Sequence, residues 1–402
     1  MIEIERIRSR FTALSRNHGG RAVAYFDGPG GTQVPEEVVT AVSDYLRHHN
    51  ANTHWHYPTS SETDALLLDA RTVAATFLNA RPEEIVFGAN MTTLTFHLAR
   101  ALGRGWRAGD EIVITELDHH ANVAPWQALA RELGIKLVTI PMNAGTGQIE
   151  FDEGLITERC RLLAIGAASN ALGTVSDLRA PIAAARAVDA LVMIDAVHYA
   201  PHFLVDVAAL NCDFLACSAY KFYGPHVGIL YARQPLLDSL DVPRLDPAPS
   251  KGPERLETGT LNHEGIVGSA AAIRFLASLG QGGELRQQLQ SAYRGLHERA
   301  QHQVSRLWQG LADIPGVHCF GPDPGRPRTP TVSFTVDGVA ADEVATRLAA
   351  RGVFVSHGDF YAQTVVERLG LADQGLVRAG CACYTTDEEI DALPLGLRAI
   401  AG

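Results

Sequence analysis

The feature that most constrains the fold is an alternation of short apolar runs with amphipathic segments between about residues 20 and 250. Strands that alternate with helices of about 10–15 residues are typical of βαβ units, which build a largely parallel sheet with helices on both faces. Expected strands lie at 84–87, 111–115, 136–140, 161–167, 191–195, 213–217 and 227–231. Expected helices lie at 35–50, 62–78 and 92–104. The pattern predicts an α/β fold.

The character of the sequence changes after residue 240. Residues 241–255 are rich in Pro and polar side chains and predict an extended loop, after which two long helical patterns follow at 263–279 and 284–312. A smaller α+β set comes next, with strands near 317–320, 331–336, 353–355 and 376–381 and helices near 341–350, 365–369 and 387–399. We therefore predict a large α/β domain at 20–260 and a small domain made of 1–19 and 285–402. The helical segment 261–284 would join them, and the N-terminal helix would pack on the small domain.

Composition excludes several classes of protein. The 402 residues are 46% hydrophobic, which is ordinary for a globular protein. The formal charge of −11 does not favour binding to nucleic acid or to an anionic membrane surface. The six cysteines form no C-x-x-C pair, so reduced thiols are expected. Residues 1–14 lack the apolar core of a signal peptide, and no run is long enough for a membrane span. These features predict a cytoplasmic protein.

Lysine is rare, and this limits where an amine can act. Only Lys136, Lys221 and Lys251 are lysines among 34 basic residues. Lys136 opens an expected strand and Lys251 lies in a loop beside Pro, so both are expected in solvent. Lys221 directly follows a strand, between aromatic residues and a Gly-Pro turn. Burial there would lower the pKa of its amine and free it to form a Schiff base, whereas a structural lysine is the plainer alternative.

Polar groups also follow the other strands, where ligands bind in open α/β sheets. Residues 88–93 place small and hydroxyl side chains at a helix start, which predicts either an anion cradle or a plain N-cap. Asp195 closes an apolar strand and needs a cationic partner, or is a satisfied structural carboxylate. The tandem His119-His120 favours ring stacking over metal binding, and no metal site is predicted. An anion cradle, a stacking ring, a buried carboxylate and a reactive lysine are together typical of a pyridoxal phosphate site.

At these residues the chain resembles the class V aminotransferase and cysteine desulfurase superfamily, including group II desulfurases and selenocysteine lyases, which are fold-type I pyridoxal phosphate enzymes. The resemblance runs through almost the whole chain and is most specific at residues 118–126, 169–174, 218–225 and 257–260. It implies a large domain with a mostly parallel mixed sheet and a smaller C-terminal α+β domain. It also implies a homodimer with shared active sites and an amino-acid substrate.

The resemblance implies roles for individual residues. Lys221 would carry the cofactor and shuttle protons, Asp195 would pair with the ring nitrogen, and His119 would stack on the ring. His198 stands where a Gln usually contacts the ring hydroxyl, and Tyr220 stands where His often binds phosphate. The residues implied in cofactor binding are Asn90, Met91, Thr92, His119, Asn170, Asp195, His198, Ser218, Tyr220, Lys221 and Thr260, the last reaching the neighbouring subunit's phosphate.

The substrate side departs from the family. Arg378 and Asn170 would hold the substrate carboxylate, and His54 would lie at the rim of the site. Group II desulfurases carry a Gly-His-His-Cys-Ala segment whose Cys accepts sulfur, whereas residues 358–362 here read Gly-Asp-Phe-Tyr-Ala. Tyr361 therefore stands at the nucleophile's position and cannot accept sulfur. Cys381 and Cys383 flank the Arg378 strand, and nothing in the pattern directs them to the cofactor.

These observations predict a desulfurase-like enzyme or a C–S or C–Se lyase that works without a persulfide cysteine. Cysteine sulfinate and selenocysteine suit such a site best, because their leaving groups need no thiolate to extract them. Two alternatives stay open: an aminotransferase or epimerase of a specialised amino acid, and a catalytically silent relative that acts as a binding partner. Retention of Lys221, Asp195, His119 and Arg378 argues against the silent relative.

Overall fold

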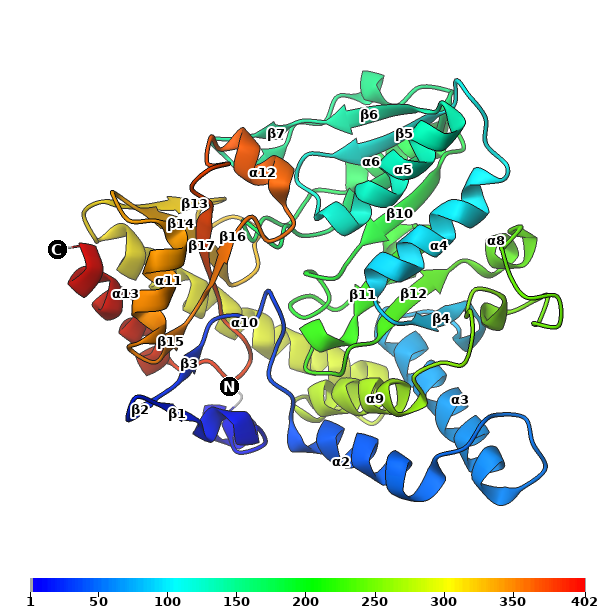
Figure 1. The fold of residues 1–402 in the computed structure, drawn as a ribbon, viewed down its shortest axis with the longest axis horizontal. Helices are drawn as coiled ribbons and strands as arrows, with labels where there is room; N and C mark the ends of the chain where they lie inside the picture. The colour runs from blue at the N-terminus through cyan, green and yellow to red at the C-terminus, as the bar shows by residue number, and fades with distance from the viewer. Residues whose placement is uncertain (1–2, 402) are drawn as a thin grey trace.

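A seven-stranded sheet forms the centre of the computed structural model, which describes residues 3–401 (Figure 1). Its strand order is β4-β12-β11-β10-β9-β5-β6, and all strands run parallel except β12, which is antiparallel to both neighbours. The bounds are β4 Ile85–Gly88, β12 Gly228–Ala232, β11 Phe214–Ser218, β10 Leu191–Asp195, β9 Cys160–Gly166, β5 Glu111–Thr115 and β6 Lys136–Ile140. The predicted mostly parallel mixed sheet is confirmed, with strand ends displaced by at most one residue.

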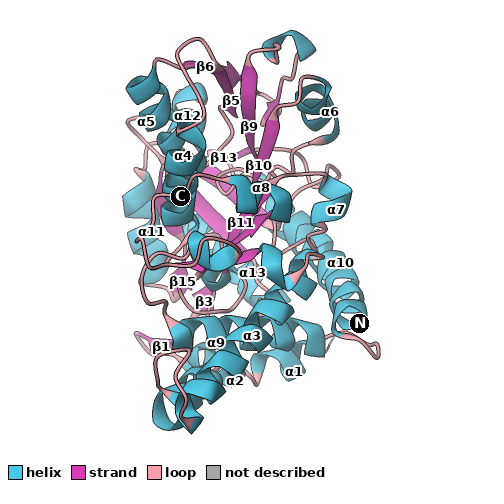
Figure 2. Cartoon of the chain, turned by 90° about the vertical axis from the view of Figure 1, so that its right-hand side faces the viewer, coloured by secondary structure: helices cyan, strands magenta, loops and turns pink. Residues whose placement is uncertain are grey.

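Alternate residues of these strands enter two different cores. On β9, Leu163 and Ile165 join the core under one layer of helices, whereas Leu162 and Ala164 join the core on the opposite face. The first layer contains α3 Pro58–Leu78, α6 Arg179–Ala187, α7 Val207–Leu210 and α9 His263–Ser278; the second contains α4 Met91–Gly103, α5 Ala124–Leu133 and α8 Gln234–Ser239. Figure 2 shows helices on both sides of the strands. Burial on both faces explains why these strands are continuous apolar runs.

A second, antiparallel sheet is built by the C-terminal part of the chain. Its order is β13-β14-β17-β16, with bounds β13 Val317–Phe320, β14 Thr331–Val336, β17 Leu376–Gly380 and β16 Ser356–Gly358. A third core lies between this sheet and the helices α10 Leu285–Ala312, α11 Ala341–Ala349 and α13 Asp387–Ala401. Helix α12 Gln363–Arg368 follows β16 after a short loop. Strand β16 was not predicted from the sequence, because three residues are too few to show a period of two.

The N-terminal segment crosses between the two sheets. Helix α1 Ile4–Arg8 contacts the C-terminal part through Arg8, which pairs with Glu389 at 3.0 Å. The short strand β3 Ala24–Tyr25 then pairs with β15 Val353–Phe354, and α2 Glu36–Asp44 packs against α9. Two small hairpins complete the structure, β1 Asn17–His18 with β2 Arg21–Ala22 and β7 Met142–Asn143 with β8 Gln148–Ile149. Ile7 of α1 is buried in the core that also contains residues of α9, and the predicted packing of this helix on the small domain stays a prediction.

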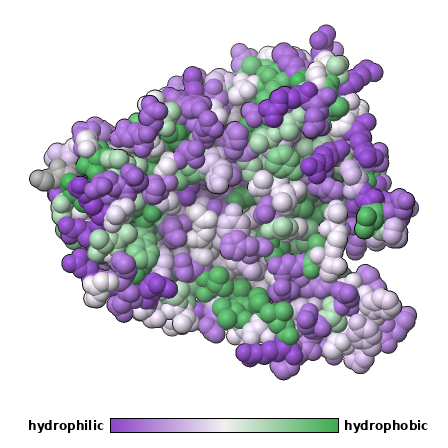
Figure 3. All heavy atoms as spheres, in the orientation of Figure 1, coloured by the Kyte–Doolittle hydropathy of each residue, from purple (hydrophilic) through white to green (hydrophobic). Residues whose placement is uncertain are grey.

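The face of the molecule seen in Figure 3 is mainly hydrophilic, with a hydrophobic patch over the region where Figure 1 draws α2 and α9. Over residues 3–401, no helix is long and apolar enough to cross a membrane. All six cysteines are free thiols. The fold therefore directs attention to the carboxyl ends of β9, β10 and β11, where the predicted functional residues follow the strands.

Candidate active site

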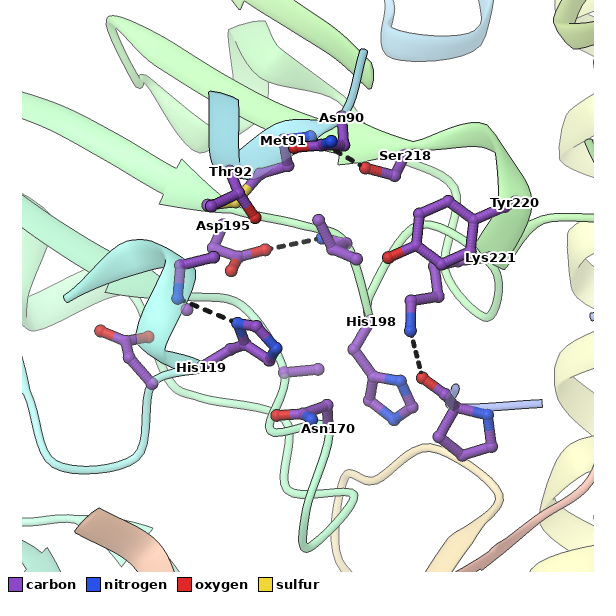
Figure 4. A pocket seen from close by; sticks show the side chains of 16 residues that line it. Asn90, Met91, Thr92, His119, Asn170, Asp195, His198, Ser218, Tyr220 and Lys221 are labelled. Atoms are coloured by element: carbon purple, nitrogen blue, oxygen red, sulfur yellow. Dashed lines mark hydrogen bonds between the residues drawn. The ribbon is translucent and has the colours of Figure 1, made fainter. Parts of the chain in front are cut away.

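A cavity of about 540 Å³, its open mouth included, lies at the carboxyl ends of the central strands. Ten of the eleven residues predicted to bind the cofactor line it, and Figure 4 labels these ten. They are Asn90, Met91, Thr92, His119, Asn170, Asp195, His198, Ser218, Tyr220 and Lys221. The eleventh, Thr260, lines a separate cleft. Segments that follow different strands thus meet at one edge of the sheet as predicted, although some are more than 100 residues apart in sequence.

Lys221 lies in the turn after β11 and points into the cavity. Its Nζ donates to the carbonyl oxygens of Pro29 and Gly30, the latter at 2.9 Å (Figure 4). Burial and the nearby Arg378 lower the pKa of the Lys221 amine to about 7, against the opposing effect of Asp195. Near neutral pH a substantial fraction of this amine is therefore unprotonated, which is the form that attacks an aldehyde.

Asp195 ends β10 and is 7% exposed. Its Oδ1 accepts a hydrogen bond of 2.9 Å from the Val197 N–H, and burial raises the pKa of its carboxyl to about 6. A carboxyl in such surroundings is stabilised as the anion by a cationic partner in the cavity. A protonated ring nitrogen would be such a partner.

Asp118 is a second buried carboxyl beside Asp195, and no role for it was predicted from the sequence. Its side chain fills the space over Gly166, where a Cβ would collide with it, and Gly166 is the register partner of Asp195. Burial and the Asp195 charge raise the pKa of Asp118 well above its ordinary value, and its Oδ2 has no partner among the described residues. Its place directly after a buried strand was the signal that could have found it.

His119 is held as a neutral ring. Its Nδ1 accepts a hydrogen bond of 3.0 Å from the Ala121 N–H, which leaves the proton on Nε2 (Figure 4). Burial, together with the charges of Lys221 and Arg378, lowers the pKa of His119 to about 4. An uncharged imidazole with one fixed edge can lie flat against an aromatic ligand.

His198 lies on the opposite side of the cavity and is 4% exposed. Its Nε2 lies 3.0 Å from Thr329 Oγ1 and 3.2 Å from Thr331 Oγ1, while burial lowers the pKa of the ring well below its ordinary value. The two hydroxyls come from a segment more than 130 residues away, so the sequence could not reveal them. They fix the ring as a neutral hydrogen-bonding group.

An anion cradle forms where α4 begins. Asn90 caps this helix, since its Oδ1 accepts from the Thr93 N–H at 2.9 Å, and Ser218 Oγ accepts from the Met91 N–H at 3.1 Å. Gly228 allows the close approach of strand and helix start, because a Cβ there would lie 2.7 Å from Asn90 Cα. The helix dipole and the hydroxyls of Thr92 and Ser218 suit a phosphate.

Arg378 on β17 approaches the cavity from the antiparallel sheet and is 3% exposed. Its Nη1 donates to Asn170 O at 2.9 Å and its Nη2 to Ser356 Oγ at 3.4 Å, while its Nε has no partner among residues 3–401. Burial lowers the pKa of Arg378 to about 9, opposed by Asp27. The side chain therefore keeps a free, buried donor edge that fits an anionic ligand.

Besides Arg378, which approaches the cavity without lining it, three predicted site residues lie away from the cavity lining. His54 is exposed and its Nδ1 lies 3.3 Å from Asp64 Oδ1. Tyr361 is 73% exposed, with its ring centroid 5.6 Å from that of His119. Thr260 lines a cleft of about 1070 Å³, open mouth included. Within the same chain these three residues do not form the walls of the cavity.

The thiols also lie apart. No cysteine occurs among the described residues that line the cavity. Cys381 and Cys383 line a different hollow beside Tyr223 and Arg299, and burial raises the pKa of Cys383 to about 12 and that of Cys381 further. Among residues 3–401, no cluster of three or more His, Cys, Asp or Glu side chains is arranged to hold a metal ion.

Known proteins are similar to this chain in sequence and in fold. The profile described as aminotransferase class-V matches residues 24–393. The chain belongs to the class V aminotransferase family. It is 35% identical to a cysteine desulfurase of Klebsiella pneumoniae over 99% of this chain and 98% of that protein, and 33% identical to one of Synechococcus elongatus over 99% and 64%.

Solved structures agree with the family assignment. An apo cysteine desulfurase from Thermococcus onnurineus superposes with a TM-score of 0.89 at 28% identity, covering 99% of this chain and 98% of that one. The S-sulfonic acid form of a cysteine desulfurase from Escherichia coli gives 0.84 at 28% identity, covering 99% and 98%. The chain is therefore a pyridoxal phosphate-dependent enzyme with cysteine desulfurase-like character. Its cradle, buried carboxyl and cavity lysine fit that cofactor.

Proposed function

We propose that this enzyme breaks the bond between Cβ and a sulfur or selenium leaving group of an amino acid, without a protein persulfide. The observation that carries the proposal is Tyr361 at the position where group II desulfurases have their nucleophilic Cys. The absence of any thiol from the described lining of the cavity supports it. Cysteine sulfinate and selenocysteine are the preferred substrates.

In this proposal each residue of the cavity has a separate role in binding the cofactor or moving a proton. Lys221 carries the cofactor and moves the Cα proton, because its amine is the one basic group among the described cavity residues whose pKa lies near 7. When bound, pyridoxal phosphate withdraws electrons from the substrate Cα and makes its bonds labile. Asp195 keeps the ring nitrogen protonated, and His119 stacks on the ring. His198 is the nearest counterpart of the family's Gln at the ring oxygen.

Phosphate and substrate occupy opposite ends of the cavity in the same proposal. The Met91 region of α4, with Thr92, Ser218 and Tyr220, holds the phosphate. Arg378 receives the substrate carboxylate through its free donor edge. With cysteine sulfinate, the C–S electron pair stays on Cβ, which takes up a proton to give alanine, and the sulfur leaves as sulfur dioxide. No electron acceptor or thiol is needed for that balance.

We further propose a homodimer with shared sites. Thr260 lies outside the cavity of its own chain, as expected of a residue that reaches the phosphate of a second copy, and exposed His54 would meet that copy's rim. Sedimentation should give a dimer, and Thr260→Ala should weaken cofactor binding without changing the mass of the assembly. A monomer with full activity would contradict this proposal.

The reaction is tested with purified enzyme reconstituted with pyridoxal phosphate. Cysteine, cysteine sulfinate and selenocysteine are supplied separately, and products are identified by mass spectrometry. Alanine or pyruvate with a released leaving group supports the proposal. A keto acid with stoichiometric pyridoxamine phosphate would instead identify an aminotransferase, and exchange of the α-proton without elimination would identify an epimerase.

A further inference from the structure

The 358–362 loop, which carries Tyr361, adopts a strained turn. Phe360 and Tyr361 have φ angles of 58° and 56°, so two successive residues with a Cβ adopt the left-handed conformation. Such a conformation is costly for residues other than Gly and persists only where surrounding contacts enforce it. The contacts around this loop therefore indicate what the strain serves.

Hydrogen bonds join both left-handed residues of the turn to the segments that follow strands β9 and β5 of the central sheet. Asn170 Nδ2 donates to Phe360 O at 2.9 Å, and the His120 N–H donates to Tyr361 O at 2.7 Å. Asp359 closes the turn from within, since its Oδ1 accepts from the Tyr361 N–H at 2.8 Å. These bonds hold the loop in one place, unlike a segment that must swing to deliver a nucleophile.

In this position the Phe360 ring covers one face of the Arg378 guanidinium. Its ring centroid lies 4.1 Å from the Cζ of the guanidinium, and its side chain packs on a small apolar cluster that includes Leu172 and Val365. Asn170 O holds Nη1 of the same guanidinium, so one face and one nitrogen of Arg378 are already occupied. The Nε–Nη2 edge remains, with Nε unpartnered and Nη2 in a long contact with Ser356.

Asn170 is fixed by the same arrangement. A carbonyl oxygen can only accept, so the bond to Phe360 O must come from Nδ2, which keeps a second N–H, and Oδ1 is left as an acceptor. This oxygen is buried without a partner among the described residues, in a side chain that lines the cavity. The bond to Phe360 uses one N–H of Nδ2 and leaves the second, so Asn170 can tie down the loop and still donate to the substrate carboxylate beside Arg378.

We propose that Phe360 is a positioning residue for substrate recognition, which, tied down by Asn170, fixes Arg378 so that its Nε–Nη2 edge is held ready for the substrate carboxylate. This proposal rests on the proposed function only in taking an α-amino acid as substrate. It makes the enzyme selective for amines that carry an α-carboxylate, whatever leaving group their side chain bears.

The test compares two probes that differ only in the carboxylate. 2-Methylalanine has no α-proton to lose, and isopropylamine is the same amine without the carboxyl group. Each is titrated into the holoenzyme while the visible band of the cofactor is followed. Phe360→Leu should raise the Kd of 2-methylalanine about tenfold, because a desolvated cation–π contact is lost, and leave that of isopropylamine unchanged.

Phe320→Leu is the matched control, because Phe320 packs on the same apolar cluster as Phe360 and has no cation–π contact with Arg378. It should leave both Kd values unchanged. Equal weakening of both probes by Phe360→Leu, or no weakening of either, would overturn the proposal. The result is independent of the products formed, so a failure of the lyase proposal would leave this ratio intact.

A second measurement examines the tether without cofactor. Asn170→Ala removes the donor to Phe360 O, so the amides of Tyr361 and Ala362 in the apo-protein should exchange hydrogen about tenfold faster or more, as the strained turn opens. Amides of the neighbouring β17 should keep their rates. Unchanged exchange at residues 361 and 362 would show that Asn170 does not hold the loop and would overturn that part of the proposal.

Discussion

The two halves of the cavity are built in different ways. The cofactor half contains side chains at the ends of strands β10 and β11 and at the start of helix α4. Both strands are buried on both faces. The substrate half depends on Arg378 from another sheet and on the strained 358–362 loop. Rigid strand ends preserve the shared chemistry, whereas a loop can change which molecule that chemistry acts on. The residues that differ from the desulfurase motif lie in the 358–362 loop, which belongs to the substrate half.

The largest effect is expected in the cofactor half. Lys221→Ala removes the single cavity amine whose pKa is near 7, so turnover should fall by about 10³-fold or more and the visible band of the lysine-bound cofactor should be lost. Lys251→Ala, at an exposed lysine in the 241–255 loop, serves as the control. Full biological function in the Lys221→Ala variant would favour the alternative of a silent binding partner.

This division also explains how much the sequence could predict. The periodic apolar runs predicted all seven central strands, and the family resemblance named ten residues that line the cavity. The substrate half was harder to predict from the sequence, because neither strand β16 nor the left-handed turn at Phe360 and Tyr361 has a sequence pattern of its own. Hydrogen bonds such as Asn170 to Phe360 link residues 190 positions apart. The division into a large domain at 20–260 and a small domain made of 1–19 and 285–402, joined by 261–284, stays a prediction.

Arg378→Ala should separate the two halves. The change removes a buried donor edge that the substrate carboxylate would fill, so amino-acid binding should weaken by about 30-fold or more. Cofactor affinity should change by less than about threefold, because Arg378 lies outside the cradle at α4. Both constants come from titrations of the visible band. Equal weakening of substrate and cofactor would remove the assignment of Arg378 to the substrate half.

The pH dependence of cofactor loading should report the Lys221 amine. The neutral amine is the nucleophile, so the rate of cofactor incorporation into the apo-protein should rise as pH increases through about 7. Asp195 favours the ammonium form and raises the pKa, so Asp195→Asn should move the midpoint to lower pH. Stopped-flow absorbance measures the rate. A midpoint near the ordinary lysine value, or a shift in the opposite direction, would show that burial does not govern this amine.

Tyr361→Phe should have the smallest effect, and its size decides what the tyrosine contributes. The ring is 73% exposed, and the contact that docks Tyr361 is made by its backbone oxygen, which the substitution keeps. Turnover should therefore change by no more than about twofold, as for other exposed positions. A proton donor would instead cost about 10²–10⁴-fold when its hydroxyl is removed.

Tyr361→Cys completes this test, because it restores the thiol of the desulfurase motif in the same strained loop. If the 358–362 loop is held in place by Asn170 and His120, a thiol there cannot swing toward the substrate, and intact-protein mass spectrometry after turnover should find no added sulfur. A persulfide at position 361 with raised sulfur release from cysteine would show the opposite. The loop would then be mobile, and the two halves of the cavity would differ by one side chain rather than by the way they are built.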